Sequence, residues 1–338
     1  MKATVRRCLR AGRRLCVGLG LCIAGSLAFT APAQAAPQRV IVDTDIGDDI
    51  DDAFALALVL ASPEFDVIGI TTAWGDTTLR VRLVQRLLRE IGRSDIPVAV
   101  GHATPSQTPF TQARWALRGA AVEPALPAAD FLLDRIRRYP GEITLLALGP
   151  LSNLGAAIAR DPAAFRRLRR VVLMGGSVRS GYAKSPFHAP RPPDKEYNIA
   201  ADIAAAQAVF GSGVNLVMMP LDSTQIRFEE AARNALFAQG TPLSDALTLL
   251  YHQWVDAYQP WASLTPTLFD VVPVAYAIDP SLCPTTPLSI VVDEQGATRE
   301  VAGAPNAQVC LAADVARLQA LFMQRLLAPA IGAVKGPR

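Results

Sequence analysis

The stretch VIVDTDIGDDIDDAFALALVL, residues 40–60, decides the fold. Its first residues, 40–42, are an apolar β-branched run of the kind that forms a buried strand. Residues 53–60 are apolar throughout and contain no glycine or proline, which indicates a buried helix. Six aspartates and one glycine lie between the two runs. The stretch therefore predicts a strand, an acidic turn and a helix in direct succession.

The same alternation of apolar runs and helical patterns continues along the chain. Near-continuous apolar strands that alternate with helices indicate a parallel sheet with both faces covered. The remaining predicted strands are residues 67–72, 97–100, 143–148, 171–174 and 216–221. The remaining predicted helices are residues 79–91, 128–138, 153–160 and 203–210. The C-terminal third is predicted to be mainly helical, with two strands at residues 288–292 and 307–311.

The first 36 residues have the features of a signal peptide. Six basic residues without an acidic one precede an apolar run over residues 15–29, and the small residues Ala33 and Ala35 follow. The apolar run is shorter than the roughly 20 residues that a membrane span needs, so we expect no stable membrane anchor. The sequence predicts export to the periplasm or beyond the cell. No linker or repeat divides residues 37–338, which we expect to form one domain.

Charge and cysteine content narrow the function further. The formal net charge of +3 includes the six basic residues of the leader, so the remaining chain is acidic. We therefore expect no nucleic-acid partner. Cys283 and Cys310 are the two cysteines that remain after the leader, and in an oxidising compartment they could pair.

The acidic turn concentrates six carboxylates in ten residues: Asp43, Asp45, Asp48, Asp49, Asp51 and Asp52. No lysine or arginine occurs between Arg39 and Arg80. Two like charges about 4 Å apart repel by roughly 4 kcal/mol at an effective dielectric of about 20, so these groups must diverge, protonate or share a cation. Oxygen donors on a flexible loop favour Ca²⁺ over Mg²⁺. The alternative is a solvated acidic cap on a helix.

Six sequence blocks, in order, resemble the inosine–uridine-preferring nucleoside hydrolase family. They are residues 42–53, 70–76, 146–153, 171–176, 196–199 and 269–276, which together span most of the chain after the leader. The resemblance implies an α/β fold: a Rossmann-like, mostly parallel mixed sheet with helices on both faces. It also implies Ca²⁺ at the carboxyl edge of that sheet, a nucleoside substrate, and a homodimer or homotetramer.

The resemblance also implies roles for individual residues. The implied metal ligands are Asp45, Asp52, the main-chain carbonyl of Leu148, and Asp270. The implied substrate contacts are Asp51 and Asn198 to the ribose 2′- and 3′-hydroxyls and Glu196 to the 5′-hydroxyl, while Asp43 supports the loop. The expected reaction is calcium-dependent hydrolysis of the N-glycosidic bond of ribonucleosides, releasing free base and ribose. In that reaction Asp45 is the catalytic residue that activates a calcium-bound water.

The chain departs from the family pattern at three places. Two residues are inserted after Gly47, so Asp48 and Asp49 could compete for roles assigned to the later aspartates. Asp76 stands where the family has asparagine, and an ionised aspartate cannot donate a hydrogen bond to the ribose, although we still expect Asp76 on the substrate side. Phe269 replaces a histidine that protonates the leaving base in some members.

Two loops supply other groups for the leaving-group side. Residues 177–195 contain four prolines and follow a predicted strand, so they form a candidate lid that carries His188. Trp254 and Tyr258 lie near a second loop. The alternative for the two aromatic residues is packing in the core, and for His188 a place on the protein surface.

The sequence alone is compatible with two other functions. Asp76 and Phe269 are compatible with an exported protein that binds nucleosides or ribose derivatives with little turnover. Asp43 to Asp45 at a strand end also resemble the nucleophile loop of Mg²⁺-dependent phosphatases. That class needs a later lysine, and Lys184 and Lys195, the lysines in the middle of the chain, both lie in the proline-rich loop.

Overall fold

Strand β1 (Gln38–Thr44) delivers the acidic turn to the middle of a sheet. It pairs in parallel with β2 (Phe65–Thr72) on one side and with β4 (Ile143–Ala147) on the other. The computed structural model describes residues 36–118, 125–183, 191–258 and 265–328. Contacts between residues group Pro37–Arg338 into one compact unit.

The main sheet has eight strands in the order β3-β2-β1-β4-β5-β6-β10-β7. Every neighbouring pair is parallel except β10 with β7, so the sheet is mixed but mostly parallel, as predicted. The strands not yet bounded are β3 (Val98–Val100), β5 (Arg170–Met174), β6 (Leu216–Met219), β7 (Thr285–Leu288) and β10 (Ala307–Cys310). Strand order reverses between β1 and β4, and such switch points form ligand crevices at the carboxyl ends of strands.

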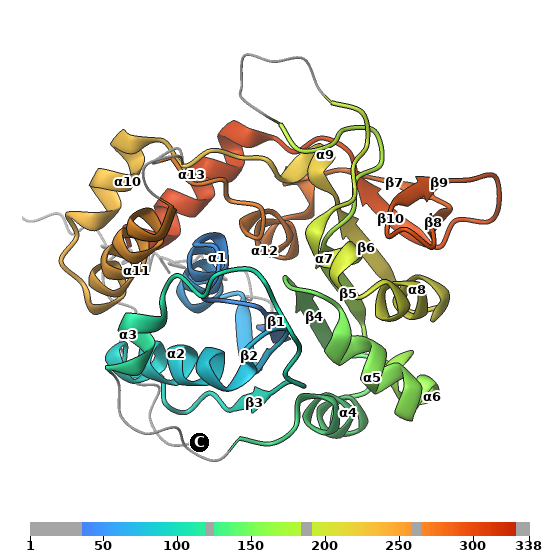
Figure 1. The fold of residues 1–338 in the computed structure, drawn as a ribbon, viewed down its shortest axis with the longest axis horizontal. Coiled ribbons are helices and arrows are strands. Elements are labelled where there is room, and N and C mark those ends of the chain that lie inside the picture. Colours follow the sequence, from blue (N-terminus) through green and yellow to red (C-terminus); the bar gives the residue numbers. More distant parts are fainter. Residues whose placement is uncertain (1–35, 119–124, 184–190, 259–264, 329–338) are drawn as a thin grey trace, which may run out of the picture. The chain divides into compact units, whose positions relative to one another are not determined.

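Helices cover the two faces of this sheet (Figure 1), and a separate cluster of buried side chains lies on each face. Val40 and Val42 belong to one cluster and Ile41 to the other, because alternate residues of a strand point to opposite faces. Helices on the first face are α1 (Asp51–Ala61), α2 (Thr77–Glu90), α11 (Pro242–Tyr258), α12 (Val271–Ile278) and α13 (Val315–Leu326). Helices on the second face are α4 (Ala128–Arg138), α5 (Ser152–Arg160) and α8 (Ile203–Gly211). Both faces are therefore covered, as the apolar strands predicted.

The C-terminal third corrects one prediction. Its described residues contain four strands rather than two: β7 and β10 join the main sheet, and β8 (Ile290–Val292) pairs with β9 (Thr298–Glu300) in a separate hairpin. These strands have only three or four residues, so their alternating pattern is too short to separate from loop sequence. Shorter helical elements complete the described chain: α3 (Ala113–Leu117), α6 (Pro162–Phe165), α7 (Tyr197–Ala201), α9 (Leu221–Thr224), α10 (Glu230–Phe237) and η1 (Pro280–Leu282).

A disulfide joins Cys283, just after η1, to Cys310 at the end of β10, with 5.7 Å between the two Cα atoms. The pairing that the two cysteines permitted is therefore present in the structure.

At the two edges of the sheet, β3 has only three residues and β7 carries Pro287. Among the described residues, none of the helices combines the length and apolar character that a membrane span requires.

Candidate active site

A cavity of about 190 Å³ lies beyond the carboxyl ends of β1, β4 and β5. The acidic turn forms one wall, and the starts of α7 and α12 form others. Its lining residues are Asp45, Asp48, Asp49, Asp51, Asp52, Thr108, Leu148, Met174, Tyr182, Glu196, Tyr197, Asn198, Phe269 and Asp270. The cavity therefore occupies the position where open parallel sheets bind ligands.

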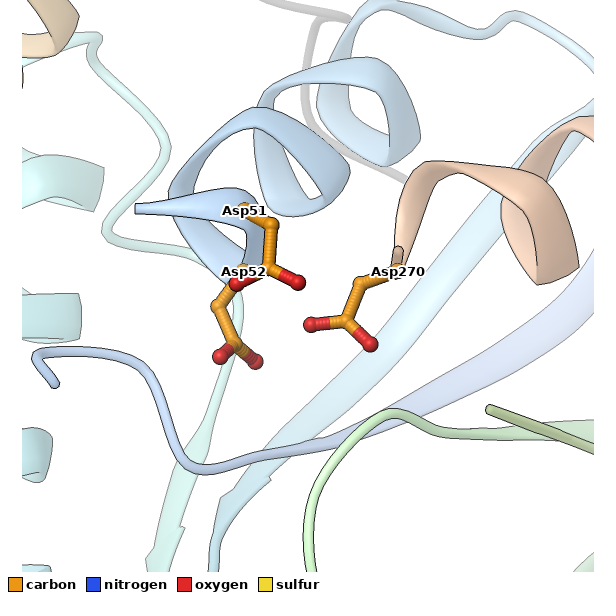
Figure 2. A group of neighbouring side chains, drawn as sticks. All are labelled: Asp51, Asp52 and Asp270. Carbon is orange, nitrogen blue, oxygen red and sulfur yellow. The ribbon is translucent and has the colours of Figure 1, made fainter. Parts of the chain in front are cut away.

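Three carboxylates that line this cavity converge (Figure 2). Oxygen atoms of Asp51, Asp52 and Asp270 all lie within 4.8 Å of one another, and the three residues are buried. Asp51 and Asp52 come from the first turn of α1, where the helix dipole favours negative charge, and Asp270 precedes the first residue of α12. This group suits a hard cation such as Ca²⁺ or Mg²⁺, both of which prefer oxygen ligands.

The electrostatics of the group also fit a cation. Burial raises the pKa of Asp270 well above its ordinary value, and the charges of Asp51 and Asp52 raise that pKa further. The pKa of Asp51 is raised in the same way, first by burial and then by Asp49 and Asp52. Carboxylates that repel each other in a buried site are stabilised by a shared positive charge. A bound metal ion would supply that charge.

Asp45 follows the end of β1 and lines the same cavity. Its side chain lies directly against Gly149, because a Cβ atom added to Gly149 would stand 2.6 Å from Asp45 Oδ1. Burial raises the pKa of Asp45 well above its usual range, the charge of Asp52 adds to the rise, and Arg80 opposes it. The tightest carboxylate group contains Asp51, so Asp45 lies beside that group rather than within it.

Asp43 and Thr44 hold the acidic turn from beneath. The buried Asp43 carboxylate accepts hydrogen bonds from the Thr71 hydroxyl and from Asn153 Nδ2, the latter at 2.7 Å. Burial raises the pKa of Asp43 to about 6, and these two hydrogen bonds partly counter the rise. The Thr44 hydroxyl donates to Asp52, which orients that carboxylate.

The opposite wall is organised by Glu196 and Asn198. Asn198 Nδ2 donates to the Leu148 carbonyl at 2.7 Å and to the Met174 carbonyl at 3.2 Å. A carbonyl oxygen has two lone pairs, so the Leu148 carbonyl keeps one for a metal. Glu196 caps α7 by accepting from the backbone N–H groups of Asn198 and Ile199, at 2.9 and 3.1 Å. Leu148, Glu196 and Asn198 all line the cavity, as expected of site residues.

Asp76 is a predicted site residue that the structure does not bring to the cavity. Its exposed carboxylate accepts a hydrogen bond from Leu79 N at 2.9 Å and so caps α2. Aspartate is a strong helix N-cap, and that local role holds the side chain away from the cavity lining. The structure therefore places Asp76 at the N-terminus of α2 and outside the cavity lining, and its expected substrate contact stays a prediction.

The three predicted leaving-group residues have different outcomes. Trp254 is buried in the core beside Tyr251, with 5.9 Å between ring centroids, and its side chain also hydrogen-bonds Asp49. It therefore supports the acidic turn without lining the cavity. Tyr258 is the last residue of α11, and its side chain lies outside the described part of the structure. His188 also lies outside the described residues.

The sequence offered weak signals for several residues that line or support the cavity. Tyr182, in the proline-rich loop, accepts a hydrogen bond from Tyr197 N at 3.0 Å, and its ring centroid lies 6.2 Å from that of Phe269. The Tyr197 hydroxyl hydrogen-bonds Thr108 at 3.0 Å. Arg80 pairs with Asp48, with 2.8 Å between Nη2 and Oδ2. The sequence pattern that could have identified Arg80 is its helical spacing with Val84 and Leu87, which places Arg80 on the apolar face of α2.

Fold and site together define an α/β protein with an acidic, metal-accepting cavity at the carboxyl edge of its sheet. The family model for inosine-uridine preferring nucleoside hydrolases matches residues 40–320. The chain belongs to this family.

Characterised relatives agree with that assignment. The pyrimidine-specific ribonucleoside hydrolase RihA of Citrobacter koseri is 32% identical over 275 residues, covering 76% of this chain and 84% of the relative. The non-specific ribonucleoside hydrolase RihC of Salmonella newport is 32% identical over 303 residues, covering 83% and 94%. A solved plant nucleoside hydrolase superposes with a TM-score of 0.76 at 27% identity, covering 87% of this chain and 100% of that structure. The protein is thus an N-glycosyl hydrolase of the nucleoside hydrolase type, and the phosphatase alternative is wrong.

Proposed function

We propose that this protein hydrolyses the N-glycosidic bond of ribonucleosides in a calcium-dependent reaction and releases free base and ribose. The convergence of Asp51, Asp52 and Asp270 beside Asp45 in one cavity is the observation that carries the proposal. The family match supports the reaction class. The names of the relatives support a ribonucleoside substrate: one is called pyrimidine-specific and another non-specific.

In this proposal Asp45, Asp52, Asp270 and the Leu148 carbonyl hold the metal. The close approach of Asp51 to Asp52 and Asp270 supports a place for Asp51 at the boundary between metal and ribose. When bound there, Ca²⁺ would supply Lewis-acid chemistry by lowering the pKa of a coordinated water. Asp51 and Asn198 orient the 2′- and 3′-hydroxyls, and Glu196 lies toward the 5′-hydroxyl.

Asp45 accepts the proton of the attacking water. Burial raises the pKa of Asp45 above its usual range in the chain without metal, and a bound cation would favour the ionised form that can accept a proton. The water attacks the anomeric carbon as the bond to the base breaks. The surrounding carboxylates stabilise the positive charge that develops on the sugar.

The leaving base departs on the side of Phe269 and Tyr182. Phe269 cannot donate a proton, so another group must stabilise the departing nitrogen. Burial and the charge of Glu196 raise the pKa of Tyr182 above its ordinary value, so its hydroxyl stays protonated. That hydroxyl accepts a hydrogen bond from Tyr197 N and keeps its own proton available for the base.

The test is release of free base from a panel of ribonucleosides and deoxyribonucleosides, with Ca²⁺ and with excess chelator. We expect chelator-sensitive release from ribonucleosides. Asp45→Asn should lower kcat by about three orders of magnitude, within the range expected for loss of a general base. Asp134→Asn, an exposed position on α4, is the matched control and should behave as the wild type. Release that persists in chelator would contradict the metal dependence.

The same panel separates turnover from binding. A wild-type protein that binds Ca²⁺ and nucleoside but releases no base would support the exported binding protein instead.

We further propose that residues 1–36 direct export and are removed, because they have a basic start followed by an apolar run. N-terminal sequencing of protein recovered from the producing cells and their medium tests that step, and light scattering tests the expected homodimer or homotetramer.

A further inference from the structure

Arg80 is an arginine buried beneath the acidic turn, with 1% of its surface exposed. Its guanidinium forms two bonds with the Asp48 carboxylate, Nη1 to Oδ1 at 3.1 Å and Nη2 to Oδ2 at 2.8 Å. Asp48 is also buried. A planar guanidinium that meets a carboxylate through two parallel bonds fixes orientation as well as charge. Asp48 is thereby committed to Arg80.

The same guanidinium binds the main chain of the turn. Nη1 donates to the carbonyl oxygens of Asp45 and Ile46, the second at 2.9 Å. Nε donates to the Trp74 carbonyl at 2.8 Å. Trp74 has φ of 63°, the left-handed region that bulky residues rarely occupy, so its neighbours must hold it there. Arg80 therefore ties together two chain segments, one of which carries the cavity-lining Asp45.

A second layer closes over the turn from residues 110–112. The Phe110 ring packs so closely on Gly47 that no Cβ would fit there, and its centroid lies 5.2 Å from the Arg80 guanidinium carbon. The Thr111 hydroxyl donates to the Asp48 carbonyl at 2.7 Å. Gln112 Nε2 donates to the Asp49 carbonyl at 2.7 Å. These bonds hold the carbonyls of the turn, and Asp45 and Asp52 from the same segment line the cavity.

We propose that Arg80 is a positioning residue that sets the metal affinity of the site by holding the inserted turn around it. Building on the proposed hydrolase function, Arg80 binds no metal and touches no substrate. It anchors Asp48 outside the ligand set and fixes the main chain that carries Asp45. Asp48 and Arg80 thus act as one unit, and Asp48 does not compete with Asp51 or Asp52 for the metal.

The test measures metal binding directly, without nucleoside. Chelator-treated wild-type protein and Arg80→Lys are titrated with CaCl₂ in a calorimeter, and the melting temperature of each is recorded without metal. Lysine keeps the charge but lacks the planar fork. We expect the Kd for Ca²⁺ to rise about 10- to 100-fold, the range seen when groups that orient metal ligands are changed. At saturating Ca²⁺, kcat should fall more than KM rises.

Arg233→Lys is the matched control. Arg233 is also a buried arginine, donates to the Phe228 carbonyl at 2.6 Å, and lies over the Tyr251 ring at 5.0 Å. It does not line the cavity. Its replacement should lower the melting temperature and leave the Kd for Ca²⁺ unchanged. A Kd for Arg80→Lys within twofold of wild type, or an equal loss in Arg233→Lys, would overturn the inference.

A double-mutant cycle with Asp48→Asn decides how Asp48 acts. If Asp48 works through Arg80, the double variant binds Ca²⁺ no more weakly than the weaker single variant. If Asp48 is itself a ligand, the two losses multiply and the inference fails. Should Arg80→Lys not fold, Asp48→Asn alone must weaken Ca²⁺ binding by about tenfold, and an unchanged Kd refutes the proposal. Base release by the wild type is a separate assay, so failure of the hydrolase proposal and failure of this one are distinguishable.

Discussion

Gly149→Ala is a substitution whose effect can be worked from one distance. The new Cβ atom would stand 2.6 Å from Asp45 Oδ1 and 2.9 Å from Asp45 N. Ordinary contacts begin at 3.4 Å, so the Asp45 carboxylate must move by about 0.8 Å. Arg80 holds the Asp45 carbonyl, which leaves the main chain little room to yield. Misplacement of a catalytic group by about 1 Å costs roughly 100-fold in rate, so we expect kcat to fall by about two orders of magnitude.

The assay is steady-state base release at saturating Ca²⁺, with unfolding by denaturant measured in parallel. Crowding should lower the free energy of unfolding by about 1–3 kcal/mol, which leaves the protein folded. Gly211→Ala is the control, because Gly211 ends α8 and a Cβ there meets nothing within 4 Å. It should keep wild-type activity and gain up to about 1 kcal/mol of stability. A folded Gly149→Ala enzyme with kcat within threefold of wild type would refute the reasoning.

Two further predictions concern stability. The pKa of buried Asp43 is about 6 in the folded chain against 3.8 as its ordinary value, so its stabilising contribution is present below pH 3.8 and lost as pH rises through about 6. In chelator, thermal melts from pH 4.5 to 7.5 should therefore show falling stability, by about 2 kcal/mol for this group. Excess Ca²⁺ should reverse the trend because metal binding needs ionised carboxylates. A flat profile in chelator would contradict this. Replacing both Cys283 and Cys310 by alanine should lower the free energy of unfolding by about 3–4 kcal/mol, given a 27-residue separation, without changing kcat, because neither lines the cavity. An unchanged midpoint of unfolding in guanidinium chloride would contradict this expected loss of stability.

Strands and helices could be predicted from the sequence where their apolar pattern is compatible with only one kind of structure. Apolar runs such as residues 143–148 can be buried on both faces only in a covered parallel sheet, and β4 occupies that position. The helix over residues 128–138 was predicted with the bounds of α4, since its apolar spacing is regular and Pro127 precedes it. The short C-terminal strands were not predicted fully, because three or four residues carry too little periodicity.

Some residues of the site could likewise be predicted from the sequence, and others could not. Aspartates crowded at a strand end predicted a cavity of carboxylates, and β1 and α1 bring Asp45, Asp51 and Asp52 there. The place of Asp76 at the N-terminus of α2 was not predicted, because a motif position gives no account of a local hydrogen bond such as that from Leu79 N. Tyr182 was missed because its contact with Phe269 joins residues 87 positions apart, which spacing along the chain does not reveal.

The two ends of the sheet bear on how this protein can associate. The unpaired side of a strand is a template for another chain, and soluble proteins blunt it with short strands or proline. Here β3 offers only three residues, with Pro127 bridged to Val100, and β7 carries Pro287, which has no N–H to donate. Both edges of the main sheet are therefore poor templates for a sheet shared between copies. Subunits would have to meet through helices and loops, so an interface could vary between relatives while the catalytic sheet stays unchanged.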